Sequence, residues 1–275
     1  MGVPRLLIVT CKLLEFISPK SAAVFAARLF TTPLKYKLPK REMEMDLQSR
    51  QSTIHIKSIN KDVVVYQYGD NAAKILLVHG WSGRGTQLVR FADACILAGF
   101  STISFDAPAH GKSSGKTTLM PQFVEVILQL EREFGPFHAA VGHSLGGMSL
   151  LNAVKKGLSL NRMAIIGSGD VIQDIIDEFI GKLKLKKETG MLMRMHFEKA
   201  GETMDSYSSY IAAGKVSIPV LVIHDEDDAE VPLKCALHIH EHLVKKELLI
   251  TKGLGHRKIL GSQNVIKKTI EFINK

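Results

Sequence analysis

The clearest chemical signal is the segment Gly142-His143-Ser144-Leu145-Gly146-Gly147, which directly follows an apolar run ending at Val141. G-x-S-x-G between a predicted strand and a predicted helix is typical of a sharp turn that exposes a serine hydroxyl. The turn crowds its neighbours, and Gly142 and Gly146 supply the small residues that it needs. The N–H groups at the start of the following helix favour developing negative charge. The segment therefore predicts that Ser144 is a nucleophile.

A serine hydroxyl needs a base, and the base needs an acid that orients it. The chain has 11 histidines, so their positions must decide among them. His256 comes just after the last predicted strand, in a loop that we expect to be flexible, at the carboxyl edge of the predicted sheet. His79 and His110 also follow strands, but each precedes a glycine in a loop with another evident role. We interpret His143 and His224 as structural, so His256 is the predicted base.

The acid is expected at the end of the strand before that histidine, where five carboxylates crowd one loop. Such a cluster is an alternative sign of cation binding, but its spacing matches no calcium loop, and we predict no metal site. Asp228 is the predicted acid, and Pro232 marks the start of the next helix. The five carboxylates are Asp225, Glu226, Asp227, Asp228 and Glu230.

An oxyanion hole would complete the chemistry. The segment His79-Gly80-Trp81-Ser82-Gly83 follows the first buried strand, where a loop can aim the Trp81 N–H at the pocket. With the Leu145 N–H it would give two donors, and loss of one such donor typically costs about 10² to 10³ in turnover. The alternative for Trp81 is that its side chain simply packs in the core.

These residues need a scaffold, and the sequence alternates apolar runs with helical patterns from about residue 60 onwards. Short apolar runs indicate buried parallel strands, and the helical stretches between them indicate a sheet covered on both faces. The fold class is therefore α/β, with a mostly parallel sheet. Expected strands are 53–58 and 62–68 as a hairpin, then 74–79, 100–105, 138–141, 162–167, 219–224 and 247–251. Expected helices are 85–98, 118–134, 145–157, 231–244 and 262–274.

The chain is predicted to have an N-terminal helical extension and connector at 1–51 and a catalytic domain at 52–275. Residues 4–31 look like two helices, and 33–50 is interpreted as a polar, basic connector. A helical insertion at about 169–215 interrupts the strand rhythm and is expected to cap the strand ends. Met191, Met193 and Met195 in this cap are candidates for an apolar substrate pocket. Their alternative role is to pack the cap against the core.

Composition limits the function. The net charge of +9 fits a solvated basic surface or attraction to anionic lipid or substrate. We predict no nucleic-acid partner, because no zinc-finger spacing or RNA-binding aromatic motif accompanies the charge.

Three well-separated cysteines argue against a disulfide framework and favour the cytoplasm. The apolar N-terminal stretch is interrupted by Lys12 and Glu15, so we expect no bilayer crossing and no signal peptide. Peripheral membrane contact through the N-terminal helices and packing or self-association of those helices both stay open.

Taken in order, these motifs resemble the α/β-hydrolase superfamily, and more narrowly its capped esterase, thioesterase and monoglyceride-lipase-like branch. The resemblance covers about residue 60 to the end. It implies the Ser–Asp–His order on Ser144, Asp228 and His256, and backbone oxyanion donors at Trp81 and Leu145. The sequence departs from the family at Ala109 and Asp225, where glycine is usual or frequent. The motifs quoted are His79-Gly80-Trp81, Asp106–Ser113, Gly142–Gly147, Asp228–Pro232 and Gly255-His256.

The expected function is hydrolysis of a carboxylic ester, of a lipid or another acyl ester, through an acyl-enzyme and without a cofactor. An acyl-thioesterase or acyltransferase would use the same triad. A non-catalytic ligand-binding homologue is the alternative of a different class. Dehalogenases and epoxide hydrolases of this fold need a carboxylate nucleophile, and Ser144 argues against both.

Overall fold

The computed structural model describes residues 3–198 and 203–275. The chain divides into two compact units, each of which is built from two separate stretches of sequence. The sheet unit comprises Pro33–Asp170 and Ser209–Lys275, and the helical unit comprises Met1–Thr32 and Val171–Ser208. The predicted domain limits near residues 52, 169 and 215 stay predictions, because compact units of this kind need not fold independently.

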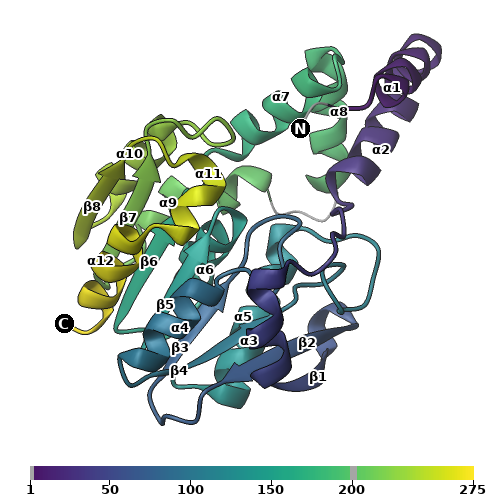
Figure 1. The fold of residues 1–275 in the computed structure, drawn as a ribbon. Coiled ribbons are helices and arrows are strands. Elements are labelled where there is room, and N and C mark those ends of the chain that lie inside the picture. Colours follow the sequence, from purple (N-terminus) through teal and green to yellow (C-terminus); the bar gives the residue numbers. More distant parts are fainter. Residues whose placement is uncertain (1–2, 199–202) are drawn as a thin grey trace. The chain divides into compact units, whose positions relative to one another are not determined.

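The sheet unit is built on an eight-stranded sheet of order β1-β2-β4-β3-β5-β6-β7-β8 (Figure 1). β1 and β2 pair antiparallel, as do β2 and β4, and all other neighbours are parallel. This confirms the predicted α/β class with a mostly parallel sheet. The strands are β1 (Arg50–Ile56), β2 (Lys61–Tyr68), β3 (Lys74–Val78), β4 (Ser101–Phe105), β5 (Ala139–His143), β6 (Arg162–Ile166), β7 (Val220–Asp225) and β8 (Lys246–Thr251).

The register of the parallel strands gathers their carboxyl ends at one edge. Val78 at the end of β3 pairs with Gly142 of β5, and His143 pairs with Ile166 at the end of β6. Asp225 at the end of β7 pairs with Thr251 at the end of β8. The loops that follow these strands therefore leave the sheet side by side, which is where open α/β sheets bind ligands.

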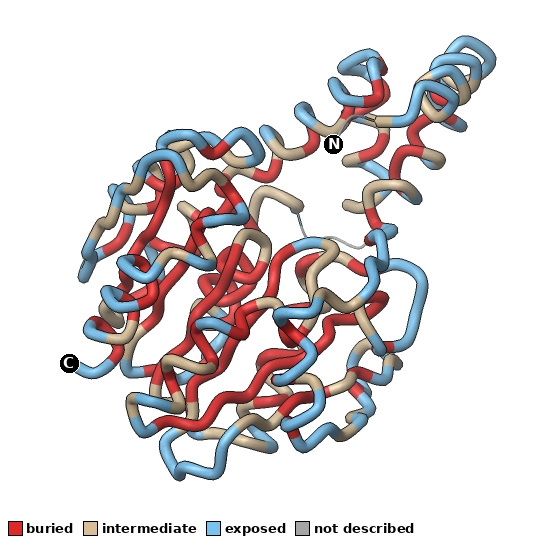
Figure 2. Tube along the Cα trace, viewed as in Figure 1, coloured by how far each residue is buried: buried red, intermediate tan, exposed pale blue. Residues whose placement is uncertain are grey.

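Helices cover both faces of the sheet, and alternate residues of each central strand face opposite layers. Leu76 and Val78 join the core on one side, whereas Ile75 and Leu77 join the core on the other. Figure 2 shows these strands as continuously buried. The first layer includes residues from α5 (Met120–Phe134), α6 (Leu145–Lys155), α9 (Ser209–Ala213) and α10 (Leu233–His242). The second includes α4 (Val89–Leu97) and α12 (Gln263–Ile273).

The segment expected as a connector at 33–50 contains a short helix that the sequence pattern does not indicate. A 3₁₀ turn at Lys40–Glu42 leads into α3 (Met43–Gln48). Met45 is fully buried in the second core layer, and the buried Glu42 accepts a 2.8 Å hydrogen bond from Thr86 Oγ1. Because one apolar side chain anchors a polar segment, hydrophobic periodicity does not reveal this helix.

The helical unit joins the N-terminal helices to the insertion between β6 and β7. Glu15 of α1 (Arg5–Ile17) accepts hydrogen bonds from the N–H of Lys186, at 2.8 Å, and from the Thr189 hydroxyl at the start of α8 (Lys187–Phe197). Phe30 of α2 (Pro19–Phe30) packs edge-on against Phe179 of α7 (Ile172–Lys182), with ring centroids 5.1 Å apart. The extension and the insertion thus form one body, completed by a 3₁₀ turn at Met204–Tyr207. In the described parts of the chain, no helix is both long and apolar enough to cross a membrane.

Candidate active site

Ser144 lies in the strained turn that the sequence predicts between β5 and α6. Its backbone angles are φ 53° and ψ −120°, a conformation that residues other than glycine rarely adopt. The turn has no room for larger neighbours. A Cβ on Gly146 would lie 2.2 Å from the Val78 carbonyl oxygen, and one on Gly142 would lie 2.7 Å from the backbone of Gly146. This close packing keeps the half-buried Ser144 in its strained conformation at the end of β5, ahead of a helix N-terminus.

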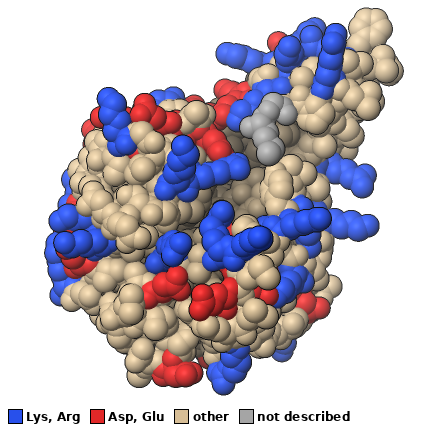
Figure 3. Space-filling view, viewed as in Figure 1, with Lys and Arg blue, Asp and Glu red and all other residues tan. Residues whose placement is uncertain are grey.

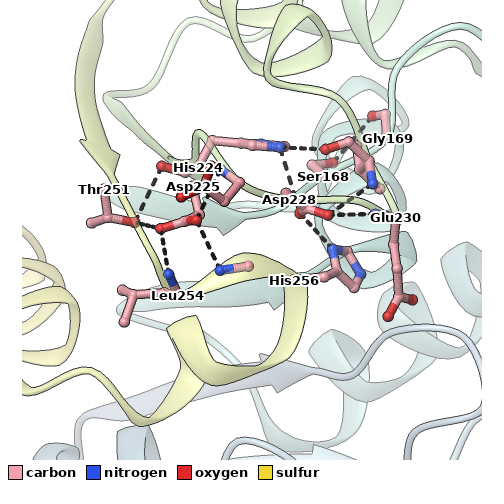
Figure 4. Close-up of polar contacts among 12 residues, drawn as sticks. Ser168, Gly169, His224, Asp225, Asp228, Glu230, Thr251, Leu254 and His256 are labelled. Atoms are coloured by element: carbon pink, nitrogen blue, oxygen red, sulfur yellow. Dashed lines mark hydrogen bonds and ion pairs between the residues drawn. The ribbon is translucent and has the colours of Figure 1, made fainter.

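The structure brings His256 and Asp228 together (Figure 4). His256 Nδ1 is 2.7 Å from Asp228 Oδ2, and the other carboxylate oxygen accepts hydrogen bonds from the N–H groups of Glu230 and Val231 at 2.8 and 2.9 Å. Burial raises the pKa of Asp228, but the hydrogen bonds from His256 and the Val231 N–H outweigh it, so its pKa lies below the usual value. The carboxylate therefore stays ionised beside the imidazole at neutral pH.

The sequence predicts that His256 lies in a flexible loop, but the structure places it in a helix. It belongs to a single helical turn, α11 (Gly255–Lys258), and is 9% exposed. Gly255 has a φ of 61°, which turns the chain into this helix directly after the loop. The glycines that suggested flexibility instead make the tight turn possible.

Asp225, the other acid considered, anchors the loop that carries His256. Its buried carboxylate accepts hydrogen bonds from Thr251 Oγ1 at 2.7 Å, the Gly255 N–H at 2.8 Å, and the N–H groups of Leu254 and Asp227 at 3.1 Å (Figure 4). Burial raises the pKa of Asp225, yet these donors lower it below the usual value. Asp225 is a structural residue that ties β7 to the loop after β8.

His143 links the nucleophile segment to the segment of the base. Its Nε2 lies 2.9 Å from the carbonyl oxygen of His256, and the two imidazole rings are 4.7 Å apart at their centroids. Burial lowers the pKa of His143 to about 3, so the ring is neutral and Nε2–H donates to that carbonyl. Ser144 follows His143 in the chain, so the turn that carries Ser144 lies next to the segment that carries His256. Among the described residues, no hydrogen bond joins the Ser144 hydroxyl to His256; such contacts often tighten only with substrate.

The predicted oxyanion donors lie on both sides of Ser144. Leu145 opens α6, where the first N–H groups have no partner within the helix. The Trp81 loop approaches from β3, since a Cβ on Gly80 would lie 3.0 Å from Ser144 Cβ. In the described part of the chain, neither the Trp81 N–H nor the Leu145 N–H donates to another protein group. The Trp81 side chain is 37% exposed and meets the His110 ring edge-on, so it does not pack in the core.

Two buried histidines support this loop, a role that sequence motifs alone did not specify. His110 Nε2 accepts a 3.0 Å hydrogen bond from the Ser82 N–H, directly after Trp81. His79 Nε2 accepts one of the same length from the Ala107 N–H. Burial lowers the pKa of His79 to about 4 and that of His110 to about 3, so both rings remain neutral acceptors. The signal available in the sequence was their position, each directly before a glycine in a loop that follows a strand.

Asp106 organises the neighbouring loop. Its buried carboxylate accepts hydrogen bonds from the Gly85 N–H at 2.7 Å, the Lys112 N–H at 2.6 Å and the Tyr66 hydroxyl at 3.0 Å. Within this loop Ala109 has a φ of 66° and Gly111 a φ of 44°, both in the left-handed region. The two positions differ in the space available to a side chain.

Only one of the substitutions Gly111→Ala and Ala109→Gly should lower the free energy of unfolding. A Cβ on Gly111 would lie 2.1 Å from Asp106 Oδ2, so Gly111→Ala should lower that free energy by at least about 2 kcal/mol. Ala109→Gly removes left-handed strain of about 1–2 kcal/mol but adds entropy to the unfolded chain, so it should be neutral or stabilising by up to about 1 kcal/mol. Urea unfolding of both variants tests this, and equal losses in both would contradict it.

The methionines predicted to line a pocket are split between two faces of α8. Met193 is fully buried, whereas Met191 and Met195 are 56% and 63% exposed. All three belong to the helical unit, and their role in substrate binding stays a prediction. In the described residues, no group of three or more His, Cys, Asp or Glu side chains is arranged to hold a metal ion.

Comparison with solved structures finds many chains of similar fold. An esterase from Exiguobacterium antarcticum is 14% identical with a TM-score of 0.66, and covers 82% of this chain and 100% of its own. Alpha/beta hydrolase domain-containing protein 10 from mouse is 19% identical with a TM-score of 0.62, over 82% and 97%. A bacterial membrane phospholipase A is 14% identical with a TM-score of 0.65, and its similarity extends over 98% of this chain and 96% of its own.

The sequence itself gives the family. A search of curated proteins finds no match. Residues 75–261 match the model of the Alpha/beta hydrolase family, a span that runs from β3 through the elbow at Ser144 to the turn that carries His256. This chain therefore belongs to the alpha/beta hydrolase family.

Proposed function

We propose that the protein is a serine hydrolase that cleaves carboxylic esters, with Ser144 as nucleophile, His256 as base and Asp228 as orienting acid. The observation that carries the proposal is the 2.7 Å contact between His256 Nδ1 and the ionised Asp228. That contact leaves Nε2 of the imidazole to take a proton, at the sheet edge where strained backbone holds the Ser144 hydroxyl. The family and the esterase and lipase folds among its structural relatives support hydrolysis of an ester-type bond.

The chemistry follows from these positions. The Ser144 oxygen bonds to the substrate carbonyl carbon while its proton passes to His256 Nε2, and the oxyanion is held by the Trp81 and Leu145 N–H groups. The carbon–oxygen bond to the alcohol then breaks, and the alcohol leaves with the proton from His256. Water then bonds through its oxygen to the acyl carbon while its proton passes to the same nitrogen. The bond from that carbon to the Ser144 oxygen breaks, the carboxylic acid leaves, and His256 returns the proton to Ser144.

The same residues would serve an acyl-thioesterase or an acyltransferase, which differ only in the leaving group or the acceptor. Model esters of increasing acyl length, compared with acyl-thioesters of the same chains, separate these reactions. A ligand-binding homologue without activity would hydrolyse none of them. The expected substrate is a small-molecule ester, and no step of this proposal needs a cofactor.

A fluorophosphonate probe tests the nucleophile, because its phosphorus is attacked by an activated serine with loss of fluoride. The native protein should be labelled at Ser144, and Ser144→Ala should lose the label. Ser159→Ala, at an exposed serine after α6, is the matched control and should label like the wild type. Heat-denatured protein should not react. Equal labelling of Ser144→Ala and wild type would remove Ser144 from the mechanism.

A further inference from the structure

The outer face of α1 is apolar and uncovered. Five large side chains on it are 56–89% exposed, with Phe16 at 89% and Leu6 at 79%. Their spacing follows the helical repeat, so they form one stripe along the helix. On the opposite side, the buried Cys11 faces the rest of the helical unit. We call this set the α1 stripe: Leu6, Val9, Leu13, Phe16 and Ile17.

Basic residues border the α1 stripe. Arg5 and Lys12 are exposed and lie seven residues apart, which places them along one edge of the stripe. The one acidic residue between positions 3 and 32 is Glu15, and it is engaged with Lys186 and Thr189 of the same unit. Among the described residues, none of the four basic side chains of α1 and α2 has an ion-pair partner. Figure 3 shows basic side chains beside uncharged surface on the helical unit.

We propose that the α1 stripe docks the protein on the surface of an anionic phospholipid bilayer. A helix with an apolar stripe and a basic edge lies in the plane of the interface, with the apolar side chains among acyl chains and the cations near headgroups. At 13 residues, α1 is about 20 Å long, which is too short to span a hydrocarbon core of about 30 Å. The net charge of +9 favours the same surface at longer range.

A second copy of the chain fits this face less well than a bilayer does. A stable protein interface uses about 20–30 residues on each side, whereas the α1 stripe supplies five. A symmetric antiparallel pairing of two α1 helices would also place the same basic edge of each copy side by side. The anionic headgroups of a bilayer instead neutralise that edge.

The proposal is tested by co-sedimentation of the full-length protein with phosphatidylcholine vesicles, with and without about 30 mol% phosphatidylglycerol. That fraction gives the vesicles a strongly negative surface. Binding should need the anionic lipid and weaken as salt rises, because surface charges are screened. Arg5→Gln with Lys12→Gln should weaken binding roughly fivefold for each charge removed. Gln keeps the helix propensity of α1, so the apolar test is the triple substitution Leu6→Gln, Leu13→Gln and Phe16→Gln, which should weaken binding more than about tenfold.

Matched controls remove equally exposed residues from the sheet unit. Substitution of Leu47, Leu97 and Val244 by Gln, and of Lys57 and Lys116 by Gln, should weaken vesicle binding much less than the matching α1 substitutions do. Circular dichroism and turnover of a water-soluble ester should match the wild type in every variant. Failure of the membrane-docking proposal is therefore distinguishable from failure of the proposed hydrolase activity. The proposal is overturned if wild-type protein ignores anionic vesicles at low salt or if the stripe variant binds like wild type. A stripe variant that changes the sedimentation mass in solution, with vesicle binding intact, would assign the face to a second copy.

Discussion

Ser144→Ala should lower ester turnover by about 10⁶-fold while the protein stays folded. The Ser144 oxygen is the only proposed group that bonds covalently to the acyl carbon, so no neighbouring side chain replaces it. Stability should change little, because the hydroxyl makes no hydrogen bond among the described residues and the half-buried site tolerates loss of one oxygen. Steady-state hydrolysis of a p-nitrophenyl ester, together with thermal unfolding, measures both effects.

His256→Ala should cause a loss of similar size, and the double variant should be little worse than either single one. Groups that act as one unit give strongly non-additive losses, because once the nucleophile is missing the base has no proton to accept. Additive losses in the double variant would mean that Ser144 and His256 act in separate steps. Ser159→Ala, on the surface, should retain wild-type turnover. A wild-type rate in Ser144→Ala would refute the proposed nucleophile.

The elements of the sheet were predictable because each rests on a local pattern. Continuous apolar runs such as 162–167 can be buried on both faces only in a central parallel strand, and the observed β6 ends one residue earlier. The turn at Ser144 was also predictable, since G-x-S-x-G between a strand and a helix is typical of a sharp turn with a strained serine. These signals lie within a few residues of one another.

What the sequence did not reveal depends on contacts between distant segments. Glu15 meets Thr189 across 174 positions, and no local pattern indicates that the N-terminal helices join the insertion. In the same way, α3 is fixed by the burial of Met45 in a core made by other segments. The acid loop is a third case. The carboxylates of Asp225 and Asp228 both accept hydrogen bonds from backbone N–H groups, but only that of Asp228 also contacts His256, and this contact joins segments 28 positions apart.

Because Asp228 contacts His256, its substitution should act mainly on turnover. Asp228→Asn should reduce turnover by about 10⁴-fold, because an amide in place of the carboxylate no longer fixes the tautomer of His256 or stabilises the imidazolium. The oxygen of the new amide can still accept from the Glu230 and Val231 N–H groups, so the unfolding free energy should fall by no more than about 1 kcal/mol. Turnover and urea unfolding of the same preparation give both numbers.

Asp225→Asn should act mainly on stability. Its carboxylate accepts from four donors and is fully buried, and an amide nitrogen in that position would face N–H groups as a second donor. A loss of about 2–3 kcal/mol is expected, with turnover falling only as far as the His256 turn loses its position. A larger turnover loss in Asp225→Asn than in Asp228→Asn, in protein that is still folded, would move the acid role to Asp225.

Acid unfolding provides an independent check on these two carboxylates. Both have pKa values below the ordinary value of aspartate, so the unfolded chain takes up protons first as pH falls. The stability that they contribute is therefore complete above the pKa of the unfolded chain, near 4, and is lost as pH drops through the lower pKa of the folded state. Asp225→Asn removes one of these groups, so its unfolding free energy should fall less steeply than that of wild type below about pH 4. An unchanged slope would show that the Asp225 carboxylate gains nothing from its four donors.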